Sequence, residues 1–362
     1  MFRLLCGKTC VLLLRTTPKV LSTLGGDRRG PCFHTARQAS CPSHSVSHTL
    51  ELMTTPARLR LGTRASALAR WQAEWVGRAL ASQAVSIELV PIATRGDEFH
   101  RDPIGNLGEP GVFTKELQRA LLDGRIDLAV HSLKDLPTEP VEGLLLAAVP
   151  ERHSPYDVLL SRGGQRLDQL PQGAVVGTGS LRRRAQLLFI RGDLVMKDIR
   201  GNVDTRLGKL EQGEYDALVL AQAGIERLGL GQHVTEVLMP PVMLPAVGQG
   251  ALGLETRADD EATRGLVARL DHYPTHQAVL AERALLAGLR GGCLAPVAAL
   301  GRAEGTGLTL LAAVLSHDGA RRLEAQNATG VEEAEQLGSR VADELLRQGA
   351  ADLIQQARDV LS

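Results

Sequence analysis

Cys293 stands apart from the other cysteines of this 362-residue chain. It lies in the stretch RGGCLAPV (290–297), where two glycines allow backbone conformations closed to other residues and a proline restricts the chain just beyond. A solitary thiol has no partner for a disulfide or a metal cage, both of which need several ligands. Two interpretations stay open: a small buried apolar residue, or a nucleophile or covalent attachment point. The other four cysteines lie near the start of the chain: Cys6, Cys10, Cys32 and Cys41.

Six basic residues follow predicted strands or begin the helices after them. Ligands of open α/β sheets bind beyond the carboxyl ends of the strands, where helix N-termini also offer free N–H groups and positive dipole ends. An arginine fork binds a carboxylate or phosphate through two hydrogen bonds. The pattern therefore predicts a cleft for a polyanion, against the alternative that each residue is a solvated surface charge. The six are Arg64, Lys134, Arg182, Arg183, Arg200 and Arg206.

Asp135 is the one carboxylate set among these cations, in Ser132-Leu133-Lys134-Asp135. Nearby cations favour its ionised form, whereas burial under a ligand opposes it. A carboxylate beside a protonated amine or a developing cation can act as acid, base and charge stabiliser. The alternative is a structural ion pair with Lys134 or another neighbour.

The sequence lacks the motifs that several other kinds of enzyme site require. Gly177-Thr178-Gly179 follows a predicted strand as a dinucleotide loop would, but Arg182 stands where the third glycine belongs. No Ser-His-Asp set, P-loop or HExxH motif is present, and the histidines are scattered. We expect neither a nicotinamide cofactor nor a metal.

The charge is balanced overall but not along the chain. There are 41 basic and 41 acidic residues, and seven of the basic but only two of the acidic ones lie in residues 1–56. The remainder thus carries a net charge of −5, which argues against a nucleic-acid partner and makes a basic cluster noteworthy. No apolar run reaches the 18 residues or so of a membrane span.

The alternation of strands and helices predicts the elements that position these residues. Two α/β units with short links imply parallel, doubly wound sheets, and a small α+β domain follows them. We expect an N-terminal extension at 1–56, domain 1 at 57–152 plus about 248–270, domain 2 at 153–247, and a C-terminal domain at 271–362. Strands are predicted at 58–63, 85–94, 126–131, 174–177, 195–199, 217–220, 251–255, 297–301, 308–315 and 321–326.

The first 52 residues show no sustained helical or strand period. They are basic, rich in hydroxyl groups and poor in acids, as in an organelle transit peptide. Alternatively, Met53 is the true start, which we favour slightly. We therefore expect a cytoplasmic protein, or an organellar one if the segment is a transit peptide.

Six stretches of this sequence resemble the porphobilinogen deaminase (hydroxymethylbilane synthase) family. They occur in order and with family-like spacing over about 57–345. The stretches are LGTRASALA (61–69), VHSLKDLP (130–137), GTGSLRR (177–183), RGNVDTR (200–206), LPAVGQG (244–250) and GGCLAPV (291–297).

The resemblance implies a reaction. Such enzymes condense four porphobilinogens head to tail with loss of ammonia, on a dipyrromethane cofactor held by a thioether, and then release hydroxymethylbilane by hydrolysis. It implies that Cys293 carries the cofactor in the C-terminal domain. It also implies that Asp135 contacts the pyrrole nitrogens, assists loss of the aminomethyl group and stabilises the cationic azafulvene.

The resemblance also implies a set of cofactor- and substrate-binding residues, of which Phe113 would stack near the growing end of the chain. The loop 105–111 departs from the family, because it lacks lysines that many members have there. The implied set is Arg64, Ser66, Gln72, Phe113, Ser132, Lys134, Thr178, Ser180, Arg182, Arg183, Arg200, Asn202, Arg206 and Gln249.

One competing interpretation concerns the fold. Two periplasmic-binding-protein-like α/β domains also suit a non-catalytic solute-binding protein for a polycarboxylate. That hypothesis gives no reason for Cys293 or for a third domain, and fold alone does not decide function. We expect porphobilinogen as the substrate, no nucleic-acid or membrane partner, and a monomer.

Overall fold

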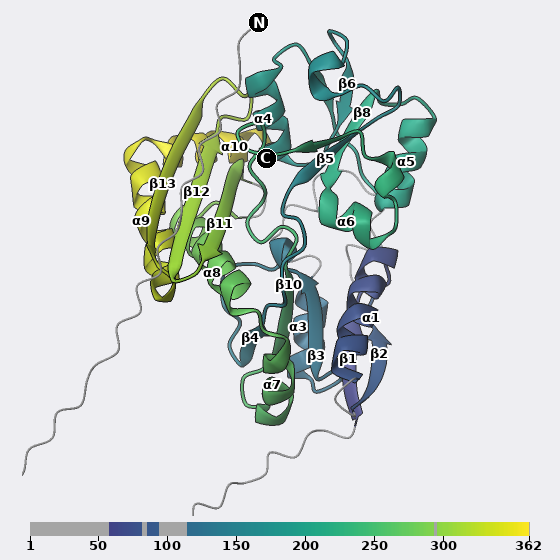
Figure 1. The fold of residues 1–362 in the computed structure, drawn as a ribbon, viewed down its shortest axis with the longest axis vertical. Coiled ribbons are helices and arrows are strands. Elements are labelled where there is room, and N and C mark those ends of the chain that lie inside the picture. The colour runs from purple at the N-terminus through teal and green to yellow at the C-terminus, as the bar shows by residue number, and fades with distance from the viewer. Residues whose placement is uncertain (1–57, 82–84, 94–113, 293–294, 362) are drawn as a thin grey trace, which may run out of the picture. The chain divides into compact units, whose positions relative to one another are not determined.

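The computed structural model describes residues 58–81, 85–93, 114–292 and 295–361, and Figure 1 traces their fold. The predictions for the N-terminal extension, the loop 105–111, Phe113 and Cys293 lie outside these residues.

The first sheet has five strands in the order β2-β1-β3-β10-β4. β1 runs parallel to both β2 and β3, as predicted. Leu59 and Leu61 of β1 are fully buried, and α1 presents Val76 and Leu80 to the same core. The bounds are β1 Arg58–Thr63, α1 Ala67–Ala81, β2 Ser86–Pro91, α3 Lys115–Leu122, β3 Leu128–Ser132, β4 Leu144–Ala148 and β10 Leu252–Arg257, with α7 at Glu261–Val267.

The second sheet repeats this plan, with strand order β7-β6-β8-β5-β9. β6 is parallel to β7 and to β8. Gly177 ends β6 where no side chain fits, because a Cβ atom there would lie 2.6 Å from Leu218 and 2.8 Å from Tyr215. The bounds are β5 Asp157–Ser161, β6 Val175–Gly177, α4 Leu181–Ile190, β7 Val195–Lys197, α5 Val203–Glu211, β8 Ala217–Ala221, α6 Gln222–Arg227 and β9 Glu236–Leu238.

The prediction of wholly parallel sheets is wrong, because each sheet contains one antiparallel strand. β10 is antiparallel to β3 and β4, and β5 is antiparallel to β8 and β9. The reason is the path of the chain: it leaves the first sheet after β4, enters the second through β5, and returns to the first through β10. The predicted fold class, two such α/β domains and a small α+β domain, is confirmed with this change.

The third sheet is a small antiparallel one, β11-β12-β13, covered by helices. Its core is apolar and includes Leu285, Leu310 and Leu337. Helices α8 and α9 approach closely at Gly338, where a Cβ atom would lie 2.4 Å from the backbone oxygen of Ala281. The bounds are α8 Tyr273–Gly288, β11 Val297–Glu304, β12 Gly307–Leu315, β13 Arg322–Gly330, α9 Ala334–Arg347 and α10 Ala350–Leu361.

Glu282 of α8 joins three parts of the chain. Its side chain is fully buried and accepts hydrogen bonds from Arg152 Nη1 at 2.6 Å, the Gly248 amide at 2.7 Å and the Gly301 amide at 2.8 Å. Arg152 precedes β5 and Gly248 precedes β10, so both segments that cross between the sheets are bonded to one carboxylate.

Replacing Glu282 should therefore destabilise the whole protein. In Glu282→Ala, Arg152 and two buried amides lose their acceptor, and breaking a buried ion pair in this way costs about 3–5 kcal/mol. Chemical denaturation followed by circular dichroism should show the unfolding midpoint displaced accordingly.

The matched control is Glu344→Ala on α9, whose exposed carboxylate pairs with Arg347 at 2.6 Å. Exposed pairs contribute about 1 kcal/mol or less. Equal losses in the two variants would contradict a joining role for Glu282.

Candidate functional site

Two adjacent strands of the first sheet end in polar residues. β1 ends at Thr63, before Arg64, and β3 ends at Ser132. Because the two strands are parallel, their carboxyl ends lie at the same edge of the sheet. Gln72 of α1 is buried and donates through Nε2 to Ser132 Oγ at 2.9 Å. The predicted residues Arg64, Gln72 and Ser132 thus lie at one edge.

A short 3-10 turn, Leu133–Asp135, follows β3 directly. Leu133 is buried and anchors the turn, while Lys134 and Asp135 are half-buried. Arg283 of α8 also holds this region, because its guanidinium donates to the backbone oxygens of Leu136 at 2.9 Å and Pro137 at 2.7 Å. The helix that leads toward the Cys293 loop is therefore bonded to the residues just after Asp135.

The strand ends of the second sheet carry the other predicted residues. Thr178 follows β6, is buried, and accepts a hydrogen bond from the Ser180 amide at 3.2 Å. Ser180 is the N-cap residue of α4. Arg206 of α5 is half-buried and donates through Nε to the Gly201 oxygen at 2.8 Å.

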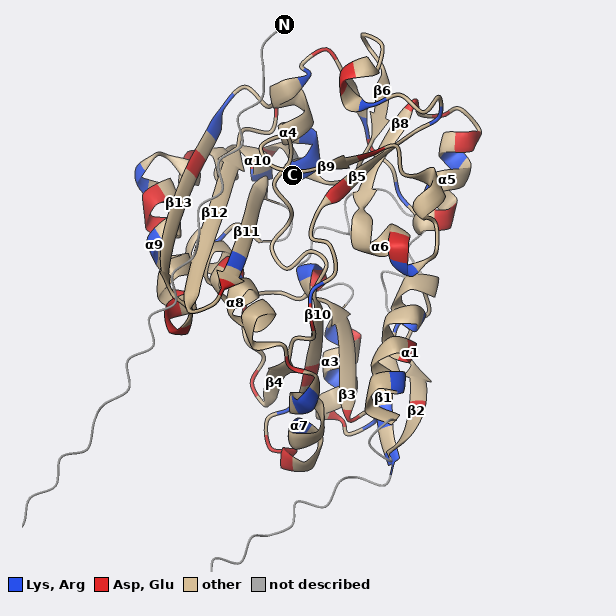
Figure 2. Cartoon of the chain, in the orientation of Figure 1, with Lys and Arg blue, Asp and Glu red and all other residues tan. Residues whose placement is uncertain are grey.

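Arg182 and Arg183 occupy an unexpected environment. Both are buried, with 4% and 7% of their surfaces exposed, and they share the carboxylate of Asp157 at the start of β5. Arg182 Nη1 lies 2.8 Å from Asp157 Oδ2, and Arg183 Nε lies 2.9 Å from Oδ1. Figure 2 shows the basic residues of α4 and the acidic start of β5. The structure thus pairs these two arginines with a carboxylate of the chain itself, which we had not predicted.

Charged residues at the ends of strands in both sheets affect one another's pKa values. Burial lowers the pKa of Lys134 to about 8; Asp135 and Asp157 oppose this shift, whereas Arg183 and Arg182 add to it. Burial also lowers the pKa of Arg206 to about 10, and Arg183 contributes. For Asp157, burial raises the pKa, but Arg182 and Arg183 outweigh burial and hold it at about 2. We call Lys134, Asp135, Asp157, Arg182, Arg183 and Arg206 the charged cluster.

Gln249 lies in the segment just before β10, where the chain crosses back to the first sheet, and bonds that segment to the charged cluster. It is buried, and its Nε2 donates to Asp157 Oδ1 at 3.0 Å and to the Pro155 oxygen at 2.7 Å. Its Oε1 is buried without a hydrogen-bond partner among the described residues. Gly248 has φ 70°, and a Cβ atom there would lie 3.2 Å from the backbone of Leu133 and Lys134. The crossing segment therefore packs directly on the turn that carries Asp135.

Arg227 is a candidate site residue that we did not predict. It ends α6, is buried, and donates through Nη2 to the Gly250 oxygen at 2.8 Å. Its guanidinium lies 5.8 Å from the ring centroid of Trp71, and its Nε is buried without a hydrogen-bond partner in the described chain. Burial lowers its pKa to about 10. The sequence does show an arginine on the helix that directly follows β8. We did not select it because it lies six residues beyond the end of that strand.

Of the other predicted residues, two are exposed, one is half-buried and two lie outside the described chain. Arg200 and Asn202 are exposed, and Asn202 is the N-cap residue of α5. Ser66 is half-buried and accepts from the Ala69 amide at 3.3 Å. Cys293 and Phe113 lie outside the described residues, so their roles stay predictions.

The loop before Cys293 has an unusual backbone where it is described. Arg290 has φ 50°, in the left-handed region that favours glycine, and Gly292 has φ 64°. Arg358 of α10 donates to the Arg290 backbone oxygen. The C-terminal helix thus holds the start of the predicted attachment loop.

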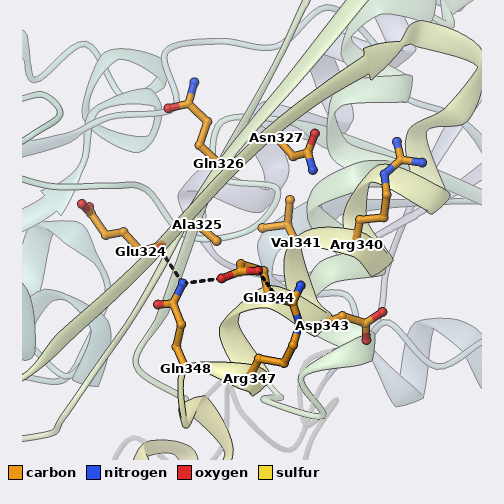
Figure 3. A pocket seen from close by; sticks show the side chains of 10 residues that line it. All are labelled: Glu324, Ala325, Gln326, Asn327, Arg340, Val341, Asp343, Glu344, Arg347 and Gln348. Carbon is orange, nitrogen blue, oxygen red and sulfur yellow. Dashed lines mark hydrogen bonds and ion pairs between the residues drawn. The ribbon is translucent and has the colours of Figure 1, made fainter.

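A polar groove lies elsewhere, between β13 and α9 (Figure 3). Within it, Glu344 pairs with Arg347 at 2.6 Å and accepts a hydrogen bond from Gln348 at 3.1 Å. None of the predicted site residues lines it.

The described residues hold no group of three His, Cys, Asp or Glu side chains placed to bind a metal. Among the helices of the described segments, none has the length and apolar character to cross a membrane.

Two family models match most of this chain. A family model described as porphobilinogen deaminase, dipyromethane cofactor binding domain, matches residues 59–265, and one for the C-terminal domain of porphobilinogen deaminase matches 276–347. In solved structures, the methionine binding protein MetQ has a TM-score of 0.39 and 14% identity, covering 61% of this chain and 91% of that one.

This chain matches curated relatives over nearly the full length of those proteins. The porphobilinogen deaminase of Desulforudis audaxviator (strain MP104C) is 50% identical over 300 residues, covering 82% of this chain and 97% of that protein. That of Chlorobium phaeobacteroides (strain BS1) is 46% identical over 307 residues, covering 83% and 98%. The chain belongs to the porphobilinogen deaminase family.

Proposed function

We propose that this enzyme is a hydroxymethylbilane synthase, a transferase of tetrapyrrole biosynthesis. It condenses four porphobilinogens head to tail, releases ammonia at each step, and frees linear hydroxymethylbilane by hydrolysis. The observation that carries the proposal is the convergence of cations from both sheets on one cluster, in a chain that matches the family over both of its domain models. A solute-binding function has only the likeness of fold in its favour.

The charged cluster fits the cofactor that the family implies. Dipyrromethane carries carboxylates, and Lys134 and Arg206 are partly buried cations that a carboxylate can reach by hydrogen bonding. Gln249 Oε1 and Arg227 Nε, both buried without a partner among the described residues, offer a further acceptor and donor. When bound through Cys293, the cofactor supplies the primer on which the pyrrole chain is built.

Asp135 is the proposed catalytic residue. It lies on the turn that the buried Leu133 anchors and that Arg283 of α8 holds through the Leu136 oxygen. Lys134 precedes it on the same turn, and the two charges interact. From there its carboxylate accepts hydrogen bonds from pyrrole N–H groups of the substrate. It also stabilises the positive charge that develops as ammonia leaves, because a fixed negative charge near that position favours the developing cation.

The binding residues divide by what their side chains touch. We propose that Lys134, Arg206 and the exposed Arg200 contact carboxylates directly, while Arg182 and Arg183 contribute through the charge that they hold around Asp157. The remaining proposed binding residues are Arg64, Ser66, Gln72, Phe113, Ser132, Thr178, Ser180, Asn202 and Gln249.

We also propose the predicted domain limits, 57–152 plus about 248–270, 153–247 and 271–362. They agree with the membership of the three sheets, in which β10 returns to the first one. We propose a cytoplasmic monomer, with an organelle as the alternative if residues 1–52 are a transit peptide; N-terminal sequencing of the native protein decides between Met1 and Met53.

The covalent primer should be visible in the intact mass. Protein made in cells that synthesise porphobilinogen should exceed the mass of its sequence by one dipyrromethane, located by peptide mapping on Cys293. Cys293→Ala should have the bare mass and no turnover. A bare mass for the unmodified sequence would exclude the attachment.

Asp135→Ala should retain the primer and lose turnover. Removing a group that acts as acid, base and charge stabiliser costs about 10²–10⁴-fold in kcat. Asp123→Ala, at an exposed carboxylate just after α3, is the control and should keep nearly full activity. Activity within a few-fold of normal in Asp135→Ala would remove this residue from the mechanism.

The pH dependence of kcat/KM should report Lys134. Its ammonium group is charged below a pKa of about 8 and neutral above it, so binding of porphobilinogen carboxylates should weaken as the pH rises through 8. Arg206 titrates near 10 and stays charged there. In Lys134→Arg, which remains charged, the decline should move to higher pH; an unchanged profile in this variant would assign the decline to another group.

A further inference from the structure

The turn that carries Asp135 is a single, short 3-10 turn. It spans Leu133–Asp135 and is closed by a hydrogen bond from the Leu136 amide to the Leu133 oxygen at 3.2 Å. Hydrogen bonds in such turns have poorer geometry than those in an α-helix. Pro137 follows and favours an extended conformation for the residue before it, and Leu136 has φ −83° and ψ 119°. The position of Asp135 therefore depends on what holds the two ends of the turn.

The start of the turn is held by the segment that crosses back to the first sheet. The Leu133 amide donates to the Ala251 oxygen at 3.1 Å. A Cβ atom on Gly248 would lie 3.2 Å from the backbone of Leu133 and of Lys134, so the two segments are in close contact. Both contacts come from residues shortly before β10. The crossing segment thus fixes the amino end of the turn.

The other end of the turn is held by α8. Arg283 donates through Nη1 to the Leu136 oxygen at 2.9 Å and through Nη2 to the Pro137 oxygen at 2.7 Å. Two nitrogens of one planar group thus bind two consecutive carbonyl oxygens, a geometry that the compact ammonium group of lysine does not reproduce. Leu136 is only 5% exposed, and buried carbonyl groups outside helices and strands need such donors.

One face of α8 makes contacts with both ends of the turn. Val279, Glu282 and Arg283 lie on the same side of the helix, because residues three and four apart are neighbours on a helix surface. Val279 packs in one apolar core with Leu133 and Leu136. Glu282 accepts a hydrogen bond from the crossing segment at 2.7 Å. The same helix leads into the loop of the proposed attachment residue, so one helix holds the turn and begins that loop.

We propose that Arg283 is a positioning residue for the condensation: its guanidinium group fixes the end of the Leu133–Asp135 turn against α8 and so holds the Asp135 carboxylate in place relative to the helix that leads to the primer. The proposal rests on the proposed function for the role of Asp135, whereas the hold on the turn does not depend on turnover. Position matters here because a displacement of about 1 Å at the reacting groups can cost about 10²-fold in rate.

The main test is Arg283→Lys in the primer-bearing enzyme. This variant keeps the positive charge and the aliphatic stem but loses the planar pair of donors. In the folded variant, kcat should fall by about 10- to 100-fold and by more than KM rises, with the primer still attached. A merely structural role would lower the unfolding midpoint and leave kcat of the folded protein unchanged, and that result would overturn the proposal.

Arg264→Lys on α7 is the matched control. Arg264 makes the same kind of contact, from Nη1 to the Ala258 oxygen at 2.9 Å. Ala258 follows β10 at the end of that strand opposite to the one that pairs with Ser132. The control variant should keep nearly full kcat.

A second comparison asks whether Arg283 acts through Asp135. Residues that act as a unit have non-additive effects on kcat. In Asp135→Ala, whose residual turnover is measured at high enzyme concentration, adding Arg283→Lys should therefore cost little more. Losses that multiply in the double variant would mean that Arg283 acts independently of Asp135, and the proposal would be wrong.

Hydrogen exchange followed by mass spectrometry tests the hold on the turn without turnover. Peptides that span 131–139 should exchange faster in Arg283→Lys than in Arg264→Lys or the unmodified protein, because the bonded amides of Leu133 and Leu136 open more often when the turn is released. If the unmodified enzyme does not consume porphobilinogen, the proposed function fails, and equal exchange in the two variants separately excludes the role of Arg283. Should Arg283→Lys not fold, Arg283→Gln, which removes the charge of this half-buried side chain, replaces it in each comparison.

Discussion

The buried carboxylate of Asp157 between two guanidinium groups is the interaction on which the site depends. Burial disfavours its ionised form, yet Arg182 and Arg183 hold its pKa at about 2, so it is negative at any physiological pH. Breaking a buried ion pair of this kind is strongly destabilising, because removing one partner leaves the other buried and uncompensated. The network therefore holds the start of α4 beside β5.

The crossing strands explain why residues of two sheets meet here. β5 and β10 each run against their neighbours because the chain passes from one sheet to the other and back. The segments that precede these strands contain Arg152 and Gly248, and both are bonded to Glu282 of α8. The same helix ends three residues before Gly291-Gly292, at the loop of the proposed attachment residue. Helix α8 thus connects both crossing segments to the loop of the proposed attachment residue.

Sequence reasoning predicted the parts of the site that follow strands. Ser132 ends β3, Lys134 and Asp135 lie on the turn that follows it, and Thr178 follows β6; these positions were predictable because short apolar strands with polar ends are visible as local patterns. It did not predict the acceptor for Arg182 and Arg183. Asp157 lies 25 residues before Arg182 and begins a strand that we did not predict.

Sequence reasoning also did not predict the direction of β10, the role of Glu282, or the bond from Gln249, a predicted binding residue, to Asp157. Each depends on contacts between residues far apart in the chain, such as the 92 residues that separate Asp157 from Gln249. Periodicity reports which face of an element is buried, but not which distant polar group shares that burial. Buried ion pairs are therefore the features most easily missed.

A high-resolution crystal structure of the primer-bearing protein would show whether the Asp157 network persists when the cofactor is attached. We expect Asp157 still to bridge Arg182 and Arg183 while carboxylates of the dipyrromethane lie within hydrogen-bonding distance of Lys134 or Arg206. A structure in which both arginines have left Asp157 to bind the dipyrromethane carboxylates would contradict this expectation.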